Sequence, residues 1–508
     1  MNQQRTGYFL YTRSKSKVAE ALKEGNIDQG VFSEVGFADE FLSYLLSSNF
    51  FPFCEETYPS PRVKKEVAPW FLLAALIGAK MHQEKSFRNI PYVLKNGSLL
   101  KLLGFNIGPG FNNKNKKDRT FPVDQDTIRK YFKDTDPEKL TLWFNSCFCE
   151  WLSKKKAYAR GLFILDATFI PLPDNNNYEN ASYVWLDKDG KHAEKDDRDA
   201  KITLCYKLSS LLNTDRDGSY YIYGGARLDS GNAQGLYEGR ELVENFIEKG
   251  GYISTLLIDR GYLDGEMLTD FKRKYKINWI IPLKSNMAAY DDAVGLSRAK
   301  DAKWEPYRIE QDRSGFTILK EEVITFCHVT SWKECSVPIN ISVKRTTDYL
   351  EGTVSYFVLA HTKKYSSQAE PFDLYQKRTK IEERHRQLKG WWSLTSFTST
   401  SYSLVVTQVL STLMTYSLMQ LYLVRSDMQH LARKTIDTIV KREKRGKYVV
   451  ICYSGSNYGV FDIGEYRVLL SWICLLPIKK DSKKRLDCGI RILHNYRQVV
   501  NKILIYNF

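Results

Sequence analysis

Two short apolar segments that each contain an aspartate constrain the fold of this chain more than any other feature. The first is LFILDATFI at residues 162–170, and the second is STLLIDRGY at residues 254–262. Further strand-like segments occupy residues 201–212 and 277–284, and helical patterns separate the later strands. Because strands that alternate with helices form a mixed or parallel sheet, the sequence predicts an α/β fold.

Asp166 and Asp259 are each predicted to end a strand of this sheet. The carboxyl ends of neighbouring strands line one crevice, where ligands bind. Two carboxylates there repel each other unless a cation lies between them, and hard oxygen ligands suit Mg²⁺ or Mn²⁺. Either aspartate alone is more typical of a turn or a helix cap. The pair, together with a third acid, favours a metal site.

The third acid is predicted on a long basic helix over residues 371–392. Offsets of 3, 4 and 7 place four of its side chains on one face: Tyr375, Arg378, Glu382 and Lys389. Glu383 would point about 100° away from this face, so Glu382 is the better candidate. A solvated charged surface is the ordinary interpretation of such a charge run, and His385 is predicted to be a surface histidine.

The charge balance indicates a polyanionic partner. The 508 residues include 75 Lys and Arg against 59 Asp and Glu, which gives a net charge of +16, and cations that neutralise phosphates release condensed counterions. Nine cysteines without a CxxC pair predict a reduced, cytoplasmic chain. The first 17 residues lack the apolar segment of a signal peptide. Residues 407–423 are predicted to form a buried helix rather than a membrane span.

The spacing Tyr-(2)-Arg-(3)-Glu-(6)-Lys of the basic helix matches the signature of the IS4 family of DDE transposases. The segments LFILDAT and LLIDRGYLDGEMLTDF resemble the surroundings of that family's first and second aspartates. The stretch from Trp70 to Phe105 is similar to its helical N-terminal region. The resemblance extends over residues 60–425, and the helix signature is its most specific part.

This resemblance implies a cut-and-paste DNA transposase. Such an enzyme binds terminal inverted repeats, cleaves the element ends and joins the 3′-hydroxyl ends to target DNA, in some relatives through a hairpin. The expected catalytic and metal-binding residues are Asp166, Asp259 and Glu382, with two Mg²⁺ ions for which Mn²⁺ can substitute. Tyr375, Arg378 and Lys389 would hold phosphates. In hairpin-forming relatives a tryptophan stacks on a flipped base, and Trp304 and Trp332 are the candidates here, although such residues are more often part of a core.

The implied fold is an RNase H-like core interrupted by a β-rich insertion domain. Five regions are expected: a helical DNA-binding region over 1–155, the first part of the core over 156–285, the insertion over 286–368, the second part of the core over 369–430, and a basic region over 431–508. The expected partners are double-stranded DNA (terminal inverted repeats and target) and a second copy in a homodimer, without a membrane. Basic runs at Asn112–Arg119, 441–447 and 479–485 could contact phosphates.

Two other functions remain open from the sequence. An RNase H-like, metal-dependent nuclease would cut DNA without joining it, and a non-catalytic descendant of a transposase would only bind DNA. The discriminating property is whether cut 3′-hydroxyl ends attack a second duplex. In each case the expected location is the prokaryotic cytoplasm, associated with the nucleoid.

Overall fold

The computed structural model divides the chain into two compact units. One consists of residues 1–134 and 434–508, and the other of residues 135–433. The boundaries of the five expected regions stay a prediction. The basic runs named above lie outside the described residues. The structure describes residues 10–474 except 34–35, 64–66, 92, 94–97, 105–122, 175–176, 216, 219, 433, 435, 437 and 440–448.

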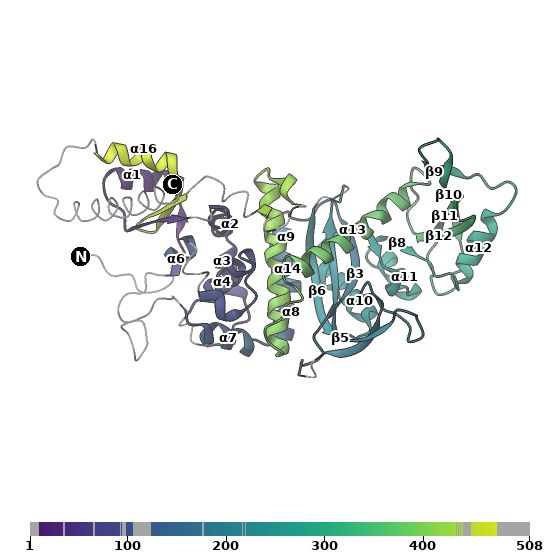
Figure 1. The fold of residues 1–508 in the computed structure, drawn as a ribbon, viewed down its shortest axis with the longest axis horizontal. Helices are drawn as coiled ribbons and strands as arrows, with labels where there is room; N and C mark the ends of the chain where they lie inside the picture. The colour runs from purple at the N-terminus through teal and green to yellow at the C-terminus, as the bar shows by residue number, and fades with distance from the viewer. Residues whose placement is uncertain are drawn as a thin grey trace, which may run out of the picture. The chain divides into compact units, whose positions relative to one another are not determined.

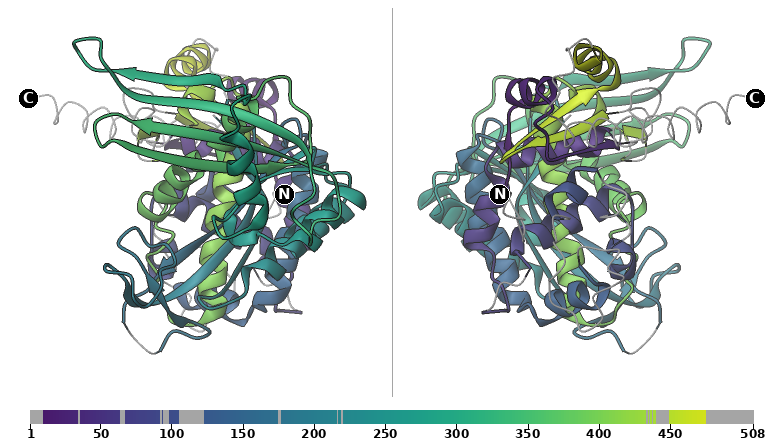
Figure 2. Two further views of the ribbon diagram at one scale, coloured as in Figure 1. Left: turned by 90° about the vertical axis from the view of Figure 1, so that its right-hand side faces the viewer. Right: turned by 90° about the vertical axis from the view of Figure 1, so that its left-hand side faces the viewer.

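The first unit joins both ends of the chain in a small sheet with the strand order β1-β14-β13-β2. In the right-hand view of Figure 2, the yellow C-terminal strands run beside purple N-terminal elements. The region over 1–155 was expected to be helical, and β1 and β2 were not foreseen, because their partners lie more than 400 residues along the chain. The elements are β1 (Thr12–Arg13), α1 (Lys15–Lys23), β2 (Gln29–Ser33), α2 (Gly36–Ser47), α3 (Phe50–Thr57), α4 (Pro69–Met81), η1 (Phe87–Asn89), α6 (Ser98–Gly104), α7 (Gln125–Asp134), β13 (Val449–Ser454), β14 (Asn457–Asp462) and α16 (Ile463–Cys474).

The second unit is built on a ten-stranded mixed sheet, which confirms the predicted α/β fold. The strands are β3 (Leu162–Pro171), β4 (Ser182–Leu186), β5 (Lys201–Thr214), β6 (Tyr221–Ser230), β7 (Thr255–Ile258), β8 (Asn278–Pro282), β9 (Glu305–Gln311), β10 (Thr317–Val329), β11 (Ile339–Asp348) and β12 (Thr353–His361). Their order is β4-β5-β3-β7-β8-β12-β11-β10-β9, with β6 also paired to β5. Only β3–β7 and β7–β8 are parallel among these pairs.

Helices of the second unit enclose the apolar side chains of this sheet. The core includes Phe163, Leu242, Met267 and Trp279, which come from β3, α10, α11 and β8. The helical elements are α8 (Pro137–Trp143), η2 (Phe144–Phe148), α9 (Cys149–Lys154), α10 (Gly235–Glu248), η3 (Arg260–Tyr262), α11 (Gly265–Arg273), α12 (Ala288–Ser297), α13 (Glu370–Gly390), α14 (Tyr402–Arg425) and η4 (Gln429–Leu431). Figure 1 shows α13 running across the sheet and α14 standing along β6.

The two long helices of the second unit have a clear basis in the sequence. Helix α13 has Pro371 in its first turn and Lys389 in its last, positions that suit the fixed φ of proline and the negative end of the helix dipole. Helix α14 is long and apolar enough to cross a membrane, but its most apolar stretch is completely buried inside the structure. It is therefore a core helix, in agreement with the buried helix predicted for residues 407–423.

The β-rich block expected before α13 is present, with one correction at its start. Residues 288–297 form α12, where a strand-like pattern was expected, and the strands follow from Glu305 to His361. These strands continue the main sheet, because β12 pairs with β8.

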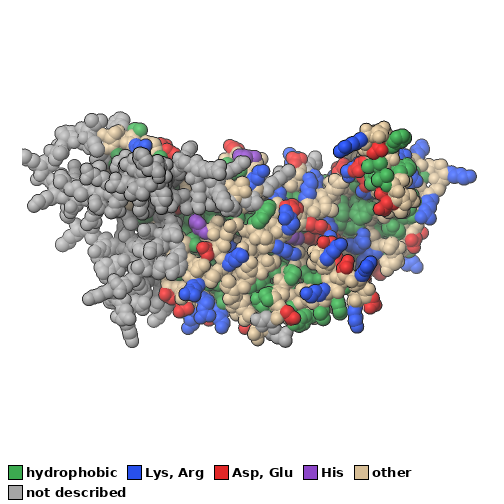
Figure 3. Space-filling model, viewed as in Figure 1, with side chains coloured by type: hydrophobic (Ala, Val, Ile, Leu, Met, Phe, Trp, Pro, Cys, Tyr) green, Lys and Arg blue, Asp and Glu red, His purple; other side chains and the backbone are tan. Residues whose placement is uncertain are grey.

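On the face shown in Figure 3, Lys and Arg side chains of the second unit are interspersed with Asp and Glu.

Candidate active site

The two predicted aspartates lie side by side where strands β3 and β7 stop pairing. The last partners of this parallel pair are Leu165 and Ile258, so Asp166 and Asp259 follow in register. The backbone N–H of Asp259 still donates to the Leu165 carbonyl at 3.2 Å. Asp259 also caps the η3 turn, since its carboxylate accepts from the N–H of Gly261 at 3.4 Å. Capping and a role in the site are therefore compatible at this position.

Asp166 lies inside β3 and not at its end, which corrects the expectation from the sequence. The strand continues to Pro171 because β5 pairs with it from Phe163 onward on the side away from β7. Asp166 is buried at this position, with a side chain that is 4% exposed. The site therefore contains one deeply buried acid and one, Asp259, that is about one-third exposed.

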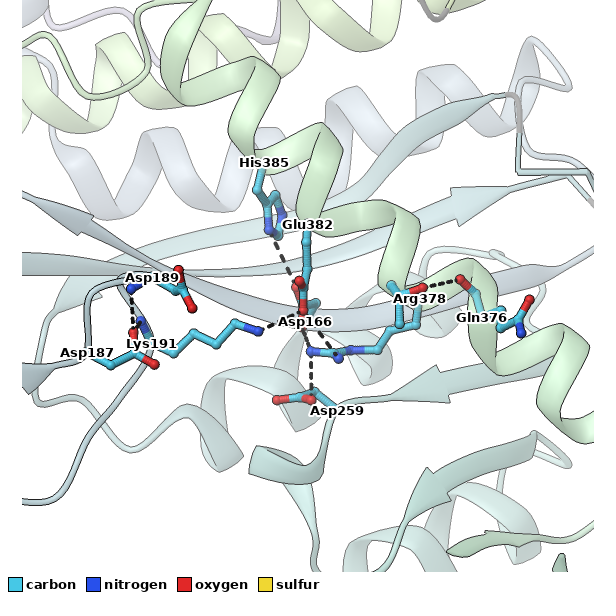
Figure 4. A network of polar contacts seen from close by, with 10 residues as sticks. Asp166, Asp187, Asp189, Lys191, Asp259, Gln376, Arg378, Glu382 and His385 are labelled. Carbon is cyan, nitrogen blue, oxygen red and sulfur yellow. Dashed lines mark hydrogen bonds and ion pairs between the residues drawn. The ribbon is translucent and has the colours of Figure 1, made fainter. Parts of the chain in front are cut away.

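Helix α13 brings a guanidinium and a third carboxylate to this pair (Figure 4). Nη2 of Arg378 lies 3.0 Å from Oδ1 of Asp166 and 2.7 Å from Oδ1 of Asp259. Glu382, one turn further along the helix, lies 3.9 Å from Nη1 of Arg378. The structure thus gathers three acids from β3, the end of β7 and α13 around a single arginine.

Burial and mutual repulsion shape the charge of this group. Burial raises the pKa of Asp166 to about 7, and the negative charges of Asp259 and Glu382 act in the same direction. Arg378 opposes this shift but does not cancel it. Burial alone would lower the pKa of Arg378, yet the neighbouring Asp166 and Asp259 leave it raised. Asp166 and Asp259 therefore share the charge of a single guanidinium.

The other two residues of the predicted helix face, Tyr375 and Lys389, lie near the site but are less exposed than Glu382. Tyr375 is buried and its ring packs on Phe357, with 5.9 Å between ring centroids. Burial raises its pKa, so the phenol is neutral. Lys389 is partly buried, which lowers its pKa, while the charge of Asp166 acts in the opposite direction.

His385 corrects another expectation, because it is buried in the site and not on the surface. Its Nδ1 lies 3.5 Å from Oδ2 of Asp166. Burial, followed by the positive charges of Lys389 and Arg378, lowers its pKa to about 3, so the contact involves a neutral imidazole. The sequence contained the signal: His385 is three residues after Glu382 and seven after Arg378, which places it on the same helix face.

Glu383, the alternative acid, faces away from the site. Its carboxylate accepts from Nε and Nη2 of Arg386 at 2.7 and 2.8 Å and from Nε2 of Gln387 at 2.9 Å. These hydrogen bonds lower its pKa to about 2. The choice of Glu382 over Glu383 therefore agrees with the geometry.

The two tryptophans proposed for base stacking lie apart from the three acids. Trp332 is buried against Trp279 in the core of the second unit, with ring centroids 6.3 Å apart. Trp304 is partly buried, and the guanidinium of Arg345 lies 4.3 Å from its ring centroid. The structure does not bring either ring to the site.

Lys191 is a neighbour of the site that the sequence did not reveal. The segment DKDG at 187–190 forms a turn. The next residue, Lys191, extends its side chain to Glu382, with Nζ 3.2 Å from Oε1. No local pattern could indicate this contact, because the two residues are 191 positions apart.

The carboxylate oxygens of this site are donors that suit a divalent cation. Carboxylate oxygens are the ligands preferred by Mg²⁺, and Asp166 and Asp259 already share one positive group, the guanidinium of Arg378. Within the described part of the chain, no three His, Cys, Asp or Glu side chains are close enough together to hold a metal. Binding by all three acids therefore requires Arg378 to leave its place between the two aspartates.

The comparison with known families agrees with this arrangement. The family model described as "Transposase DDE domain" matches residues 158–418, more than half of the chain, and this range contains all three acids. No curated protein sequence matches the chain. The chain belongs to the transposase DDE domain family, a family of enzymes that act on DNA in transposition.

Proposed function

We propose that this protein is a cut-and-paste transposase of the IS4 type that cleaves the ends of its element and joins them to target DNA. The observation that carries the proposal is the convergence of Asp166, Asp259 and Glu382 on one side of the sheet, within the family match. The continuous helix α13, which carries Tyr375, Arg378, Glu382 and Lys389, supports assignment to IS4. Antiparallel β6–β5–β3 followed by parallel β3–β7–β8 supports an RNase H-like core.

The three acids would hold two Mg²⁺ ions, which Mn²⁺ could replace. Such ions, when bound, activate the attacking oxygen and stabilise the leaving oxygen of a phosphoryl transfer. The carboxylates act as ligands, and burial of Asp166 keeps water away from one side of the site. His385 packs against Asp166 and orients its carboxylate.

The cations of α13 would bind the DNA backbone. A guanidinium that leaves the carboxylates of Asp166 and Asp259 can donate two parallel N–H bonds to a phosphate. Lys389 adds a point charge further along the same helix face. Tyr375, whose ring packs on Phe357, lies one turn before Arg378 on that face and would also face the phosphates. Terminal-repeat recognition is assigned to the helical N-terminal region, and bringing two ends together requires a second copy of the chain.

The test is a cleavage and joining assay with Mg²⁺ on a labelled duplex that carries the inverted repeats flanking the gene. Cleavage at the repeat end followed by attack of the 3′-hydroxyl on a second duplex is the expected result. Cleavage without joining would replace the proposal with the nuclease. Binding without cleavage in Mg²⁺ or Mn²⁺ would replace it with the DNA-binding descendant.

A further inference from the structure

We propose that Lys191, on the loop between β4 and β5, binds a backbone phosphate of the DNA strand held at the three acids. The inference rests on the proposed function and adds a DNA contact from outside α13. Figure 4 shows the side chain of Lys191 reaching from its turn toward Glu382. This turn lies outside the helix signature and outside both aspartate segments.

The turn that carries Lys191 is built to hold its backbone in one place. One carboxylate oxygen of Asp187 accepts from the N–H groups of Asp189 and Lys191, at 2.9 and 2.8 Å. The N–H of Asp187 donates to the Lys191 carbonyl at 2.8 Å. Gly190 has a φ of 74°, which an L-residue with a side chain adopts only at a cost. The backbone of Lys191 is therefore held in place, while its four-carbon side chain can still move.

The contact of Lys191 with Glu382 contributes little to folding. The side chains are 62% and 46% exposed, and ion pairs at such exposure are screened by solvent and oppose side-chain entropy. A fixed turn that ends in a weak pair at the edge of a site points to a role other than stability.

The exposure of the cations shows which one an incoming strand meets first. Arg378 is 16% exposed and already holds Asp166 and Asp259. Lys389 is partly buried. Lys191 is the most exposed of the three, and it lies beside Glu382, the most exposed of the three acids.

The chemistry of a phosphodiester fits this position. A phosphate that enters near Glu382 adds a negative charge and acceptor oxygens to the solvent side of the site. The Lys191 ammonium can turn from the carboxylate to a phosphate oxygen by rotating its stem, without movement of the backbone. It binds as a point charge with rotatable donors, which needs no fixed fork geometry.

The experiment compares Lys191→Ala with Lys188→Ala, an exposed lysine of the same turn. Binding of the full chain to the inverted-repeat duplex is measured as a function of salt. The expected slope of log K against log salt falls by about 0.9 in Lys191→Ala, because one phosphate contact is lost, and is unchanged in Lys188→Ala. Lys191→Arg should restore it. Phosphate-ethylation interference should disappear at one phosphate near the cleavage site only in Lys191→Ala.

The possible outcomes separate this inference from the proposed function. If the wild-type chain cuts and joins while the two alanine variants have equal slopes and the same interference pattern, Lys191 does not bind phosphate and the inference is wrong. If the wild-type chain itself neither cuts nor joins, the proposed function fails. A lower slope for Lys191→Ala would in that case still establish a phosphate contact at this turn.

Discussion

The three-acid site and the charged pairs of strands β10 and β11 belong to the same sheet, but they balance their charges in different ways. On β10 and β11, Lys344 lies 2.6 Å from Glu321, while Glu322 is bound by Lys320 at 2.8 Å and by Arg345 at 2.6 Å. Burial would raise the pKa of Glu322, but the hydrogen bonds from Lys320 and Arg345 outweigh it and leave the pKa lowered. Each acid there has a cation of its own.

At the site, the two aspartates outnumber the cation that lies between them. Two carboxylates, Asp166 and Asp259, share one guanidinium nitrogen, and the buried carboxyl has a raised pKa. Within the described residues, buried nitrogens without a hydrogen-bond partner occur in both groups: Nε of Arg378 and Nε2 of His385 at the site, and Nε of Arg345 on β11. Such polar atoms cost free energy in a folded protein.

The difference separates charges that stabilise the fold from charges that serve chemistry. Balanced pairs lower the free energy of the folded state, whereas a buried acid that shares its cation and has a strongly shifted pKa is typical of a functional site. Variants that change one kind of charge and leave the other intact can test this distinction.

Neutralising an acid of the site should abolish cleavage, and neutralising an acid of β10 should not. We expect Asp166→Asn or Asp259→Asn to slow Mg²⁺-dependent cleavage at least about a thousandfold, because a metal ligand contributes several kcal/mol to the transition state. DNA binding should remain nearly intact. Glu322→Gln is the control. Single-turnover cleavage of the repeat duplex measures the effect, and a wild-type rate for Asp166→Asn would remove that residue from the site.

The same Asp166→Asn change should stabilise the metal-free protein at high pH. The pKa of Asp166 is raised from 3.8 to about 7 in the folded state, so the folded chain keeps a proton there that the unfolded chain loses. Stability is therefore lost as pH rises from about 4 to about 7. We expect Asp166→Asn to gain on the order of 3 kcal/mol relative to wild type between pH 4.5 and pH 8. Urea unfolding in EDTA measures this gain, and an equal pH dependence of both proteins would contradict it.

Breaking the balanced pairs should have the opposite effect on stability. Glu322→Gln removes the acceptor charge for Lys320 and Arg345, so we expect a loss of about 1–2 kcal/mol in the free energy of unfolding at pH 7. Thermal and urea unfolding, followed through the transition of the second unit, would detect this loss. An unchanged midpoint would mean that these pairs, although ordered, contribute nothing.

The cations of α13 should affect DNA binding more than folding. We expect Lys389→Ala to reduce the slope of log K against log salt by about 0.9, as the loss of one phosphate contact does. Arg378→Ala should do the same and weaken binding to every DNA sequence alike. Lys377, which lies on the same helix, provides the control through Lys377→Ala. Equal slopes for all variants would show that the predicted helix face does not touch DNA.

The parts of the site that could be predicted from the sequence are those with a local period. Offsets of 3, 4 and 7 identified the face of α13, and apolar segments identified β3 and β7. His385 was misjudged although its offset from Glu382 fits the same face, because a histidine in a charged run was read as solvated. Its burial depends on the acid of β3 that it contacts.

The features that could not be predicted depend on contacts between distant segments. Strand β6 contains Gly224 and Gly225 and a register shift against β5. These features obscure the alternation of side chains that would identify a strand. Strands β1 and β2 are short and acquire partners only from the far end of the chain. The contact of Lys191 with Glu382 arises from the fold alone.

Glu382 is proposed to complete the catalytic triad, and its neighbour Glu383 provides a matched control. Glu382→Gln and Glu383→Gln remove the same charge from adjacent positions of α13, but only Glu382 faces the aspartates. Cleavage of the repeat duplex with Mg²⁺ would be measured for both variants and the wild-type chain. We predict that Glu382→Gln is inactive and that Glu383→Gln cleaves at close to the wild-type rate. Cleavage by Glu382→Gln, or loss of cleavage only in Glu383→Gln, would rule out Glu382 as the third acid of the site.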